Sequence, residues 1–340
     1  MTYHELRRQV QAAGLLNRSG WLSLPVALAT VTLGPAVLAI LVAAPGAWRF
    51  AAIPFLTLFW MQLGFFGHDA GHNQIFPRTE HNRRLGLFCY PFMLGLTFRP
   101  WVIKHNLHHV ETNVIDSDPD LINPIIALTL QDAQERRGFL RWIVRYQAYA
   151  YPILALFATL AFRVDAWRYA IVGTIVQGNA EKYAGERKFE LVLLSVNAVL
   201  WLVLPAILLG PLLWLAIFGI AQMLLGFHMA FVFAPNHKGM PMIEDATNIP
   251  FLDHQVLTSR NVAGSLVTDF MYGGLNYQVE HHLFPTMPRS NFPACREFVL
   301  RCCAESGLAY TEESFLQSCK TLFDSLNDIG RELELVPVTA

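Results

Sequence analysis

Long apolar runs dominate this sequence, and four of them are long enough to form membrane-spanning helices. A helix needs ~20 residues to cross a hydrocarbon core of ~30 Å. The four runs lie at residues 22–44, 48–66, 190–209 and 211–234. Because Gly210 and Pro211 form a turn between the last two runs, we predict an all-α integral membrane protein with four transmembrane helices in two hairpins.

Outside these four runs, two segments have the apolar spacing of amphipathic helices, and one further apolar run is shorter. Leu6, Val10 and Ala13 share one face of a helix over residues 3–16, which is expected to lie along the membrane surface. A shorter run, at 148–162, begins among arginines. Near the C-terminus, an amphipathic helix packed on a cytosolic cap is predicted by Phe315, Leu322, Phe323, Leu326 and Ile329.

These elements predict a single domain over residues 1–340. Its parts, in chain order, are an N-terminal interfacial helix, a first transmembrane hairpin, a cytosolic or interfacial segment, a second transmembrane hairpin and a cytosolic helical cap. Their bounds are 1–20, 22–66, 67–189, 190–234 and 235–340.

Composition strengthens the membrane assignment and excludes some classes of function. Hydrophobic residues make up 54% of the chain and charged residues only 15%, against ~25% charged in soluble domains. The net charge of −1 gives no electrostatic footprint for nucleic acid. The five cysteines include no C-x-x-C pair, which disfavours a cysteine-bound zinc or iron–sulfur site and fits free thiols.

Histidines carry the candidate chemistry. Seven of the 12 fall in three windows of five residues, and residues four apart on a helix share a face. The third window repeats the i, i+3, i+4 spacing of the second, with Gln278 in its first position. The clustered histidines, which we predict to be metal ligands, are His68, His72, His105, His108, His109, His281 and His282.

The number of imidazoles favours two redox-active iron ions. A mononuclear zinc centre uses three or four protein ligands, fewer than this sequence offers. Asp69 stands where a zinc protease of H-E-x-x-H type has its general-base glutamate. A metal transporter is disfavoured, because it would place ligands along a transmembrane path rather than in clusters at one face.

Lysine and arginine positions set the expected orientation. Residues 73–147 contain nine of them and residues 163–188 five, whereas the opposite loops, 45–49 and 210–211, contain only Arg49. The positive-inside rule therefore places both termini and the histidine clusters in the cytosol. A fifth crossing by the shorter run would separate the third cluster from the first two, so that run is expected to be interfacial or re-entrant.

The three clusters resemble the histidine boxes of the membrane fatty acid desaturase family. The matching segments are HDAGH, HNLHH followed by VETNVIDSDPD, and GGLNYQVEHHLFPTMPR. The resemblance covers roughly residues 60–295, and the glutamine in the third box resembles that of the front-end desaturases and of related acyl and sphingolipid desaturases. It implies that the seven box histidines are ligands and that His237, after the last span, is an eighth. Gln278 then replaces a histidine, as a weak or water-mediated ligand or as a hydrogen-bond partner of one.

Outer residues orient ligating imidazoles by accepting their second N–H. The candidates near the boxes are Asp69, Asp120, Asp269 and Asn276, and a surface or capping role remains the alternative for each. His228 is expected to be a buried polar residue of the last span. His4, His81 and His254 have no motif and are expected to be ordinary.

The resemblance implies an O₂-dependent enzyme that introduces a cis double bond into an acyl-CoA or acyl-lipid chain held in the membrane. The cofactor would be a non-haem di-iron centre, and the regioselectivity delta-5 or delta-6-like. A related hydroxylase, acetylenase or sphingolipid desaturase would use the same ligands. Aromatic residues expected to line an acyl tunnel, or to pack on lipid, are Phe88, Tyr90, Phe92, Phe98 and Trp101.

The electrons for such a reaction must come from another protein. The sequence has no G-x-G-x-x-G motif, no iron–sulfur cysteine pattern and no H-P-G-G haem motif. We therefore expect an external donor, either a ferredoxin or a cytochrome b5 with its reductase.

Overall fold

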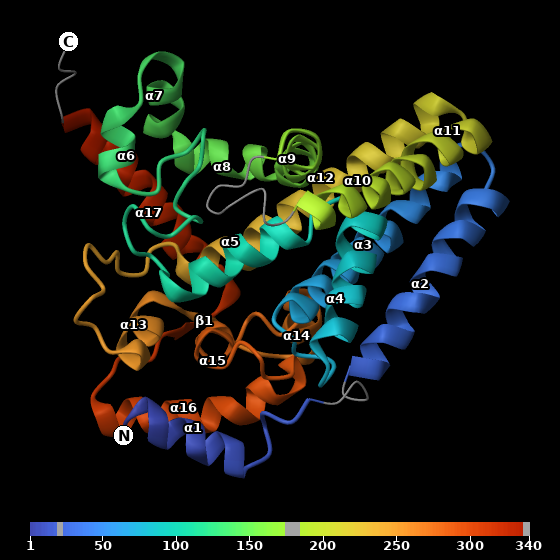
Figure 1. The fold of residues 1–340 in the computed structure, drawn as a ribbon. Coiled ribbons are helices and arrows are strands. Elements are labelled where there is room, and N and C mark those ends of the chain that lie inside the picture. Colours follow the sequence, from blue (N-terminus) through green and yellow to red (C-terminus); the bar gives the residue numbers. More distant parts are fainter. Residues whose placement is uncertain (19–22, 174–183, 336–340) are drawn as a thin grey trace. The chain divides into compact units, whose positions relative to one another are not determined.

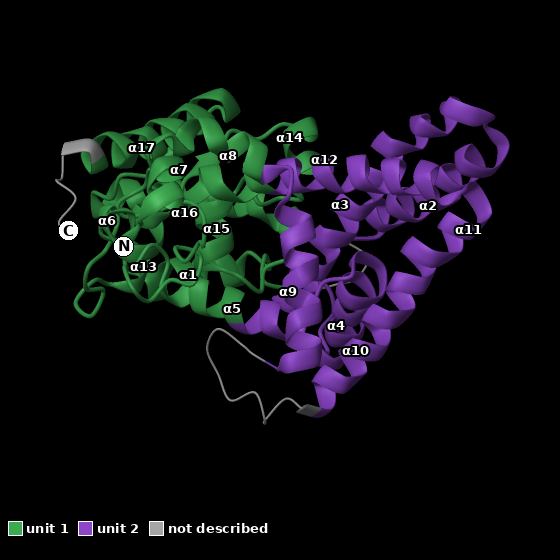
Figure 2. Ribbon diagram, turned by 90° about the horizontal axis from the view of Figure 1, so that it is seen from above, with its two compact units in different colours: residues 1–17, 104–154, 230–340 green, residues 18–103, 155–229 purple. Residues whose placement is uncertain are grey.

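A computed structural model describes residues 1–18, 23–173 and 184–335, and nearly all of its regular structure is helical (Figure 1). The chain divides into two compact units (Figure 2). Unit 1 comprises residues 1–17, 104–154 and 230–340, and unit 2 comprises residues 18–103 and 155–229. The single-domain organisation stays a prediction.

Unit 2 contains most of the apolar helices. The elements that lie wholly within it are α2 (Leu24–Ala43), η2 (Gly46–Ala51), α3 (Ala52–Gly71), α4 (Thr79–Leu87), η3 (Phe88–Leu94), α9 (Ala158–Val172), α10 (Ala184–Ala198), η5 (Val199–Val203) and α11 (Leu204–Leu209). Helix α2 packs along α3, and α10 packs against η3 and α9.

Unit 1 contains a second set of helices and a two-stranded parallel sheet. Its elements are α1 (Tyr3–Ala12), α6 (Leu130–Glu135), α7 (Gly138–Arg145), α13 (Phe251–Thr258), β1 (Asn261–Val262), α14 (Leu266–Tyr272), α15 (Gln278–Leu283), η6 (Arg289–Asn291), α16 (Phe292–Ser306), β2 (Glu312–Glu313) and α17 (Phe315–Leu335). Three helices run from one unit into the other: α5 (Arg99–Val110), α8 (Gln147–Ala155) and α12 (Pro211–His237).

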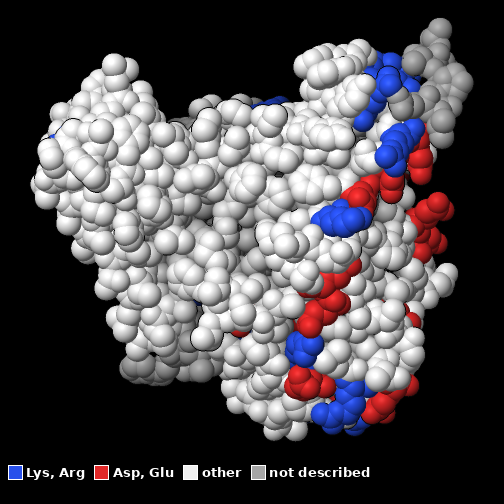
Figure 3. Space-filling model, turned by 180° about the vertical axis from the view of Figure 1, so that it is seen from behind, with Lys and Arg blue, Asp and Glu red and all other residues white. Residues whose placement is uncertain are grey.

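Within the described residues, four helical stretches are long and apolar enough to cross a membrane, as the hydropathy pattern predicts. They are Leu24–Ala43, Gly46–Gly71, Gly185–Leu209 and Pro211–His237. Large apolar side chains on them are exposed, including Val31, Leu38, Ile207 and Leu212. Much of the face shown in Figure 3 carries no charged side chain. Such a surface is suited to lipid rather than to water.

The fifth apolar run forms α8 and α9, which are separated by a break after Ala155. Neither helix alone has the ~20 residues that a crossing needs. That this run does not cross, and that the termini and central segment are cytosolic, stay predictions. Lys182, one of the basic residues behind the orientation, lies outside the described residues, as does the first residue of the run 22–44.

Helix α1 departs from the expectation for the N-terminus. Thr2 and Glu5 form a capping box that fixes its first turn. Its predicted apolar face is real, but Leu6 and Val10 are fully buried in a protein core with Val299 of α16. This face is therefore covered by protein and is not available to lipid. The sequence pattern is the same in both cases, because lipid and a protein core select the same apolar stripe.

The predicted amphipathic helix near the C-terminus is confirmed as α17. Leu322 and Leu326 are buried in a cluster with Leu121, Ile126 and Tyr151. This cluster joins α17 to the segment that follows the second histidine box. All five cysteines are buried with free thiols.

A buried glutamate caps the helix that carries the second box. Glu190 of α10 accepts hydrogen bonds from the backbone N–H groups of Phe98 and Arg99, at 3.0 and 2.9 Å. Arg99 begins α5, so these are N–H groups that the helix itself leaves unsatisfied. The Arg99 side chain also pairs with the half-exposed Glu186, with its Nε and Nη2 atoms 2.8 and 2.9 Å from the two carboxylate oxygens.

We predict that Glu190→Leu destabilises the protein by about 2–4 kcal/mol, because the backbone N–H groups of Phe98 and Arg99 lose their side-chain acceptor. Glu186→Gln removes only a half-exposed ion pair and is expected to cost less than about 1 kcal/mol. Thermal unfolding of both variants in detergent measures the difference. Equal shifts for the two variants would contradict the capping role.

Candidate metal centre

Three buried histidines of unit 1 converge from separate elements. His108 lies near the end of α5, His237 is the last residue of α12 and His282 lies on α15. One ring nitrogen of each lies within 4.8 Å of one ring nitrogen of the others. Metal–nitrogen bonds of about 2.1 Å hold two ligands of one ion within about 4.2 Å of each other. The three nitrogens are thus close to a coordinating arrangement.

The other nitrogen of each ring already faces an oxygen acceptor. Nδ1 of His108 lies 3.0 and 3.1 Å from the carboxylate oxygens of Asp118. Nδ1 of His237 lies 3.0 Å from the backbone oxygen of Thr258, and Nδ1 of His282 lies 2.9 Å from Oε1 of Gln255. Each Nδ1 therefore carries the proton, which leaves Nε2 of each ring unprotonated and able to act as an acceptor or as a metal ligand.

Of the three histidines, His282 has the environment most suited to binding a cation. Its Nε2 atom is buried, and no residue in the described part of the chain bonds it. Burial, with the neighbouring His237 and His108 rings, lowers the pKa of His282 well below its ordinary value. The ring is therefore neutral, which is the form that binds metal. A buried lone pair without a donor is the feature that a metal ion would satisfy.

Three more imidazoles gather beside this group in unit 1. Nε2 of His109 lies 3.3 Å from Nε2 of His105. The ring centroids of His109 and His281 are 4.6 Å apart, and those of His109 and His282 are 4.1 Å apart. Unit 1 alone therefore brings six of the eight predicted ligands into one cluster.

The first box lies in unit 2, at the end of α3. The rings of His68 and His72 have centroids 4.8 Å apart, and Nδ1 of His68 lies 3.4 Å from Oδ1 of Asp69. Both histidines and Asp69 are buried. The helical i, i+4 spacing thus brings the two rings together, as the sequence predicts.

Comparison with known proteins decides the family. The fatty acid desaturase family matches residues 45–314 of the chain. The chain belongs to the fatty acid desaturase family. This membership associates the chain with lipid metabolism.

Individual desaturases match over most of this chain. It is 30% identical to the Delta(6)-fatty-acid desaturase of Caenorhabditis elegans, over 84% of this chain and 66% of that protein. It is 32% identical to an acyl-lipid (9-3)-desaturase of Physcomitrium patens, over 78% and 51%. It is 26% identical to a Delta 8-(E)-sphingolipid desaturase of Emericella nidulans, over 85% and 55%. The aligned region spans about half to two thirds of the length of these relatives.

Gln278, which occupies the first position of the third box in this family member, contacts a predicted ligand. Its Nε2 atom lies 2.8 Å from Nε2 of His237, while its Oε1 accepts a hydrogen bond of 3.0 Å from Asn236. Asn236 also donates to the backbone oxygen of Leu275, at 3.0 Å. The amide thus hydrogen-bonds a candidate ligand, which is one of the roles expected from the sequence.

The predicted outer residues differ in what they touch. Asp118, rather than Asp120, makes the short contact to His108. Asp120 has one oxygen 3.6 Å from Nδ1 of His108 and another 2.9 Å from Nζ of Lys104. Asp269 accepts a hydrogen bond of 2.9 Å from Asn276. Neither Asp269 nor Asn276 bonds a histidine within the described ranges. Instead of the predicted contacts to ligating histidines, they bond each other, and this bond links α14 to the segment just before the third box.

Sequence reasoning missed a set of residues outside the boxes. Gln255 and Thr258 of α13 bond His282 and His237, and Thr112 lies 3.2 Å from Nδ1 of His282. His254, expected to be ordinary, has its Nε2 atom 2.8 Å from the backbone oxygen of Thr112. No motif marks these positions, so the sequence offers no signal for them.

Glu280 lies within the third box, and its carboxyl group is hydrogen-bonded by residues from later and earlier segments of unit 1. It accepts hydrogen bonds from Asn261, at 2.7 Å, and from Tyr310, at 2.9 Å. Oδ1 of Asn261 also accepts the N–H of Val279, at 2.9 Å, which satisfies the first turn of α15. Burial raises the pKa of Glu280 to about 7 despite these bonds.

Aromatic rings pack tightly against the first-box helix. Tyr90 and Trp101 have ring centroids 5.1 Å apart, and Trp101 lies 5.6 Å from the His68 ring. A Cβ atom at Gly67 would lie 2.0 Å from the Tyr90 ring, and one at Gly71 would lie 2.4 Å from the Trp101 ring. These rings therefore fill the space beside α3, and the glycines permit that approach.

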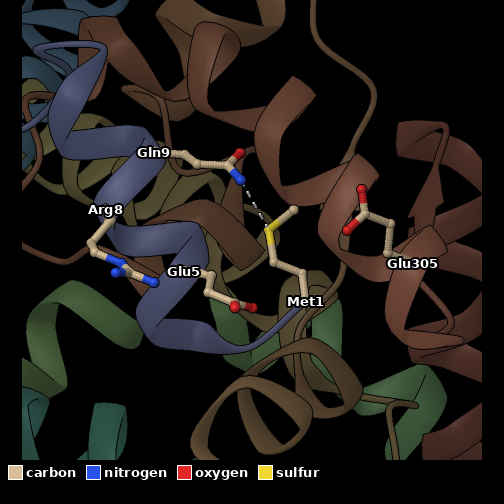
Figure 4. Close-up of a pocket in the computed structure, with 5 residues that line it drawn as sticks. All are labelled: Met1, Glu5, Arg8, Gln9 and Glu305. Atoms are coloured by element: carbon tan, nitrogen blue, oxygen red, sulfur yellow. Dashed lines mark hydrogen bonds between the residues drawn. The ribbon is translucent and has the colours of Figure 1, made fainter.

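Two surface hollows of unit 1 differ in their relation to the histidines. One, of about 510 Å³, is lined by Met1, Glu5, Arg8, Gln9 and Glu305, and contains no box residue (Figure 4). The other, of about 150 Å³, is lined mainly by acidic and polar residues and includes Asp118. The second hollow therefore adjoins Asp118, whose buried carboxylate contacts His108.

We predict that Asp118→Asn lowers metal affinity about 10–100-fold, because outer partners of ligating histidines typically contribute that much. Asp269→Asn serves as the matched control, since Asp269 touches no box histidine in the described structure. Iron titration of both purified variants measures the effect. A loss of the same size in both would show that the contact to His108 is not its cause.

We predict that Gly67→Ala destabilises the protein by about 1–3 kcal/mol, because the added methyl group meets the buried Tyr90 ring. Gly219→Ala is the control: it also lies within a helix, but nothing comes within 4 Å of its added Cβ, so it is expected to be neutral or stabilising. Melting temperatures in detergent compare the two. Unchanged stability in Gly67→Ala would contradict the packing described here.

Proposed function

We propose that this chain is an O₂-dependent fatty acyl desaturase that holds two non-haem iron ions and introduces a cis double bond into an acyl chain. The observation that carries the proposal is the cluster of six imidazoles in unit 1, three of which have Nδ1 bonded to oxygen acceptors. This arrangement leaves ring lone pairs directed to a common region, as metal binding requires.

The donor set supports iron in a two-ion centre. Imidazole suits iron, and one ion takes at most six ligands including water and substrate. Six imidazoles in unit 1 exceed the three or four that one ion usually takes from a protein. In the proposal, His68 and His72 complete a set with His105, His108, His109, His237, His281 and His282. When bound, the irons supply the O₂-dependent oxidation of an unactivated methylene group.

The chain's own residues bind and orient the ions and exclude water. Asp118, Thr258 and Gln255 hold the Nδ1 protons of three rings, so that these rings do not turn. Five of these six histidines are buried, and His281 and His282 are almost wholly inaccessible to solvent, whereas His105 is partly exposed. A dry site protects an oxidising centre from side reactions.

The proposed substrate is an acyl-CoA or an acyl lipid within the membrane. Relatives that act on fatty acids, acyl lipids and sphingolipids all match at similar identity, so front-end regioselectivity of the delta-5 or delta-6 type rests on the glutamine in the third box. The electrons would come from an external ferredoxin or cytochrome b5 with its reductase. The active site and both termini would face the cytosol.

A sphingolipid desaturase is the second candidate, because a sphingolipid desaturase is among the matched relatives. A hydroxylase using the same ligands is the third. Both would retain the metal centre and differ only in product. Product analysis therefore separates them, whereas metal analysis does not.

We predict that expression in a host lacking polyunsaturated lipids produces new unsaturated acyl chains, because the host supplies membrane acyl substrates and an electron donor. Double-bond mapping by mass spectrometry of total fatty acids and of sphingoid bases identifies the product. The purified protein is expected to contain two irons per chain. Hydroxylated chains, or new double bonds only in sphingoid bases, would favour the other candidates.

His108→Ala is expected to abolish the new product, because it removes a ligand held by Asp118. His81→Ala is its matched control, since His81 is exposed and its ring contacts Phe76; it is expected to retain the product. An active His108→Ala variant, or iron-free protein that is fully active, would refute the proposed centre.

A further inference from the structure

We propose that α13, which lies outside the histidine boxes, fixes the metal-binding nitrogens of two ligands, and that Gln255 is the positioning residue for His282. The inference rests on the proposed function, since it takes His237 and His282 to be ligands. It adds a helix, and a residue in it, to the machinery that the boxes supply.

Gln255 meets His282 from the side opposite its metal-binding nitrogen. Oε1 of Gln255 lies 2.9 Å from Nδ1 of His282, and both residues are buried. The Gln255 Nε2 atom is buried, and no residue in the described ranges bonds it. Burying an amide whose NH₂ group has no partner costs free energy. The contact between the Gln255 oxygen and His282 is therefore the feature that accounts for the position of this side chain.

Thr112 offers a second acceptor to the same nitrogen of His282. Its hydroxyl donates to the backbone oxygen of His108, at 2.7 Å. The hydroxyl lone pairs are therefore free to accept, and Oγ1 lies 3.2 Å from Nδ1 of His282. Two acceptors, from Thr112 and Gln255, thus face the same ring nitrogen. A proton on Nδ1 satisfies both, and it leaves Nε2 unprotonated.

The end of α13 serves the second ligand in a similar way. Thr258 is the last residue of this helix, and a helix leaves its final carbonyl groups without intrahelical partners. The Thr258 carbonyl accepts the N–H of His237, at 3.0 Å. One short helix thereby supplies acceptors to histidines from two different elements, α12 and α15.

Helix α13 is itself anchored to the turn that follows the second box and to the hydrophobic core. His254 bonds the backbone oxygen of Thr112 through Nε2, at 2.8 Å. Leu252 and Val256 are buried in a cluster with Val279 and Leu283 of α15. A displacement of α13 would therefore disturb the acceptors of both ligands at once.

The three acceptors differ in charge, and this difference has a chemical consequence. His108 faces the carboxylate of Asp118, whereas His237 and His282 face neutral carbonyl oxygens. A carboxylate partner raises the basicity of a ligating imidazole more than a neutral partner does. Gln255 therefore both orients His282 and keeps it a weaker donor than His108.

The test compares three variants of the full-length, iron-loaded protein. Gln255→Leu removes the acceptor and is expected to lower iron affinity about 10–100-fold. Gln255→Glu keeps an acceptor oxygen, and so is expected to retain iron while lowering the reduction potential of the centre. Gln147→Leu is the matched control: Gln147 is equally buried in unit 1, but its amide bonds only backbone groups of Ala127 and Leu326.

Metal titration and redox titration followed by absorption spectroscopy give the readouts. The inference is supported if Gln255→Leu loses iron affinity, Gln147→Leu does not, and Gln255→Glu restores affinity with a lower potential. It is overturned if Gln255→Leu binds iron as the parent does, or if both leucine variants lose affinity alike. Failure of the proposed function looks different, because the parent itself would then bind no iron.

Discussion

A buried imidazole can serve as a metal ligand through one nitrogen only if something accepts the proton on the other, and the structure around the histidines is arranged by this requirement. Asp118, Thr258 and Gln255 meet it for three rings. Asp118 is in turn fixed by the backbone N–H groups of Asn113 and Asp120, both at 2.8 Å. The packing of unit 1 is thus organised around acceptors as much as around ligands.

The membrane helices contribute chiefly through their ends. His237 is the last residue of α12, and the first box closes α3. The second box lies on α5, whose first N–H groups are held by Glu190 from within an apolar helix. An ionisable group in such a helix is costly unless it is bonded, and Glu190 is bonded to the start of the helix that carries the second box.

Features with a local signal could be predicted from the sequence, and those that depend on tertiary contacts could not. Hydropathy and i, i+4 spacing predict the four long helices and the clustered rings. The choice of Asp118 over Asp120 depends on a turn in which Asn113 and Asp116 have positive φ, which the sequence does not specify. Gln255 and His282 are 27 positions apart in the sequence, so no local pattern marks their contact. The apolar face of α1 could be predicted, but not whether lipid or protein covers it, because both select the same apolar stripe.

The link between the third box and the strand β2 bears on the order in which the protein matures. Glu280 is held by Asn261 and Tyr310, and β1 pairs with β2 at Glu312 and Glu313. During synthesis, all eight histidines emerge before these last contacts can form. The buried carboxylate within the third box therefore reaches its final bonding only after Tyr310 and β2 have been synthesised and have packed against Asn261 and β1.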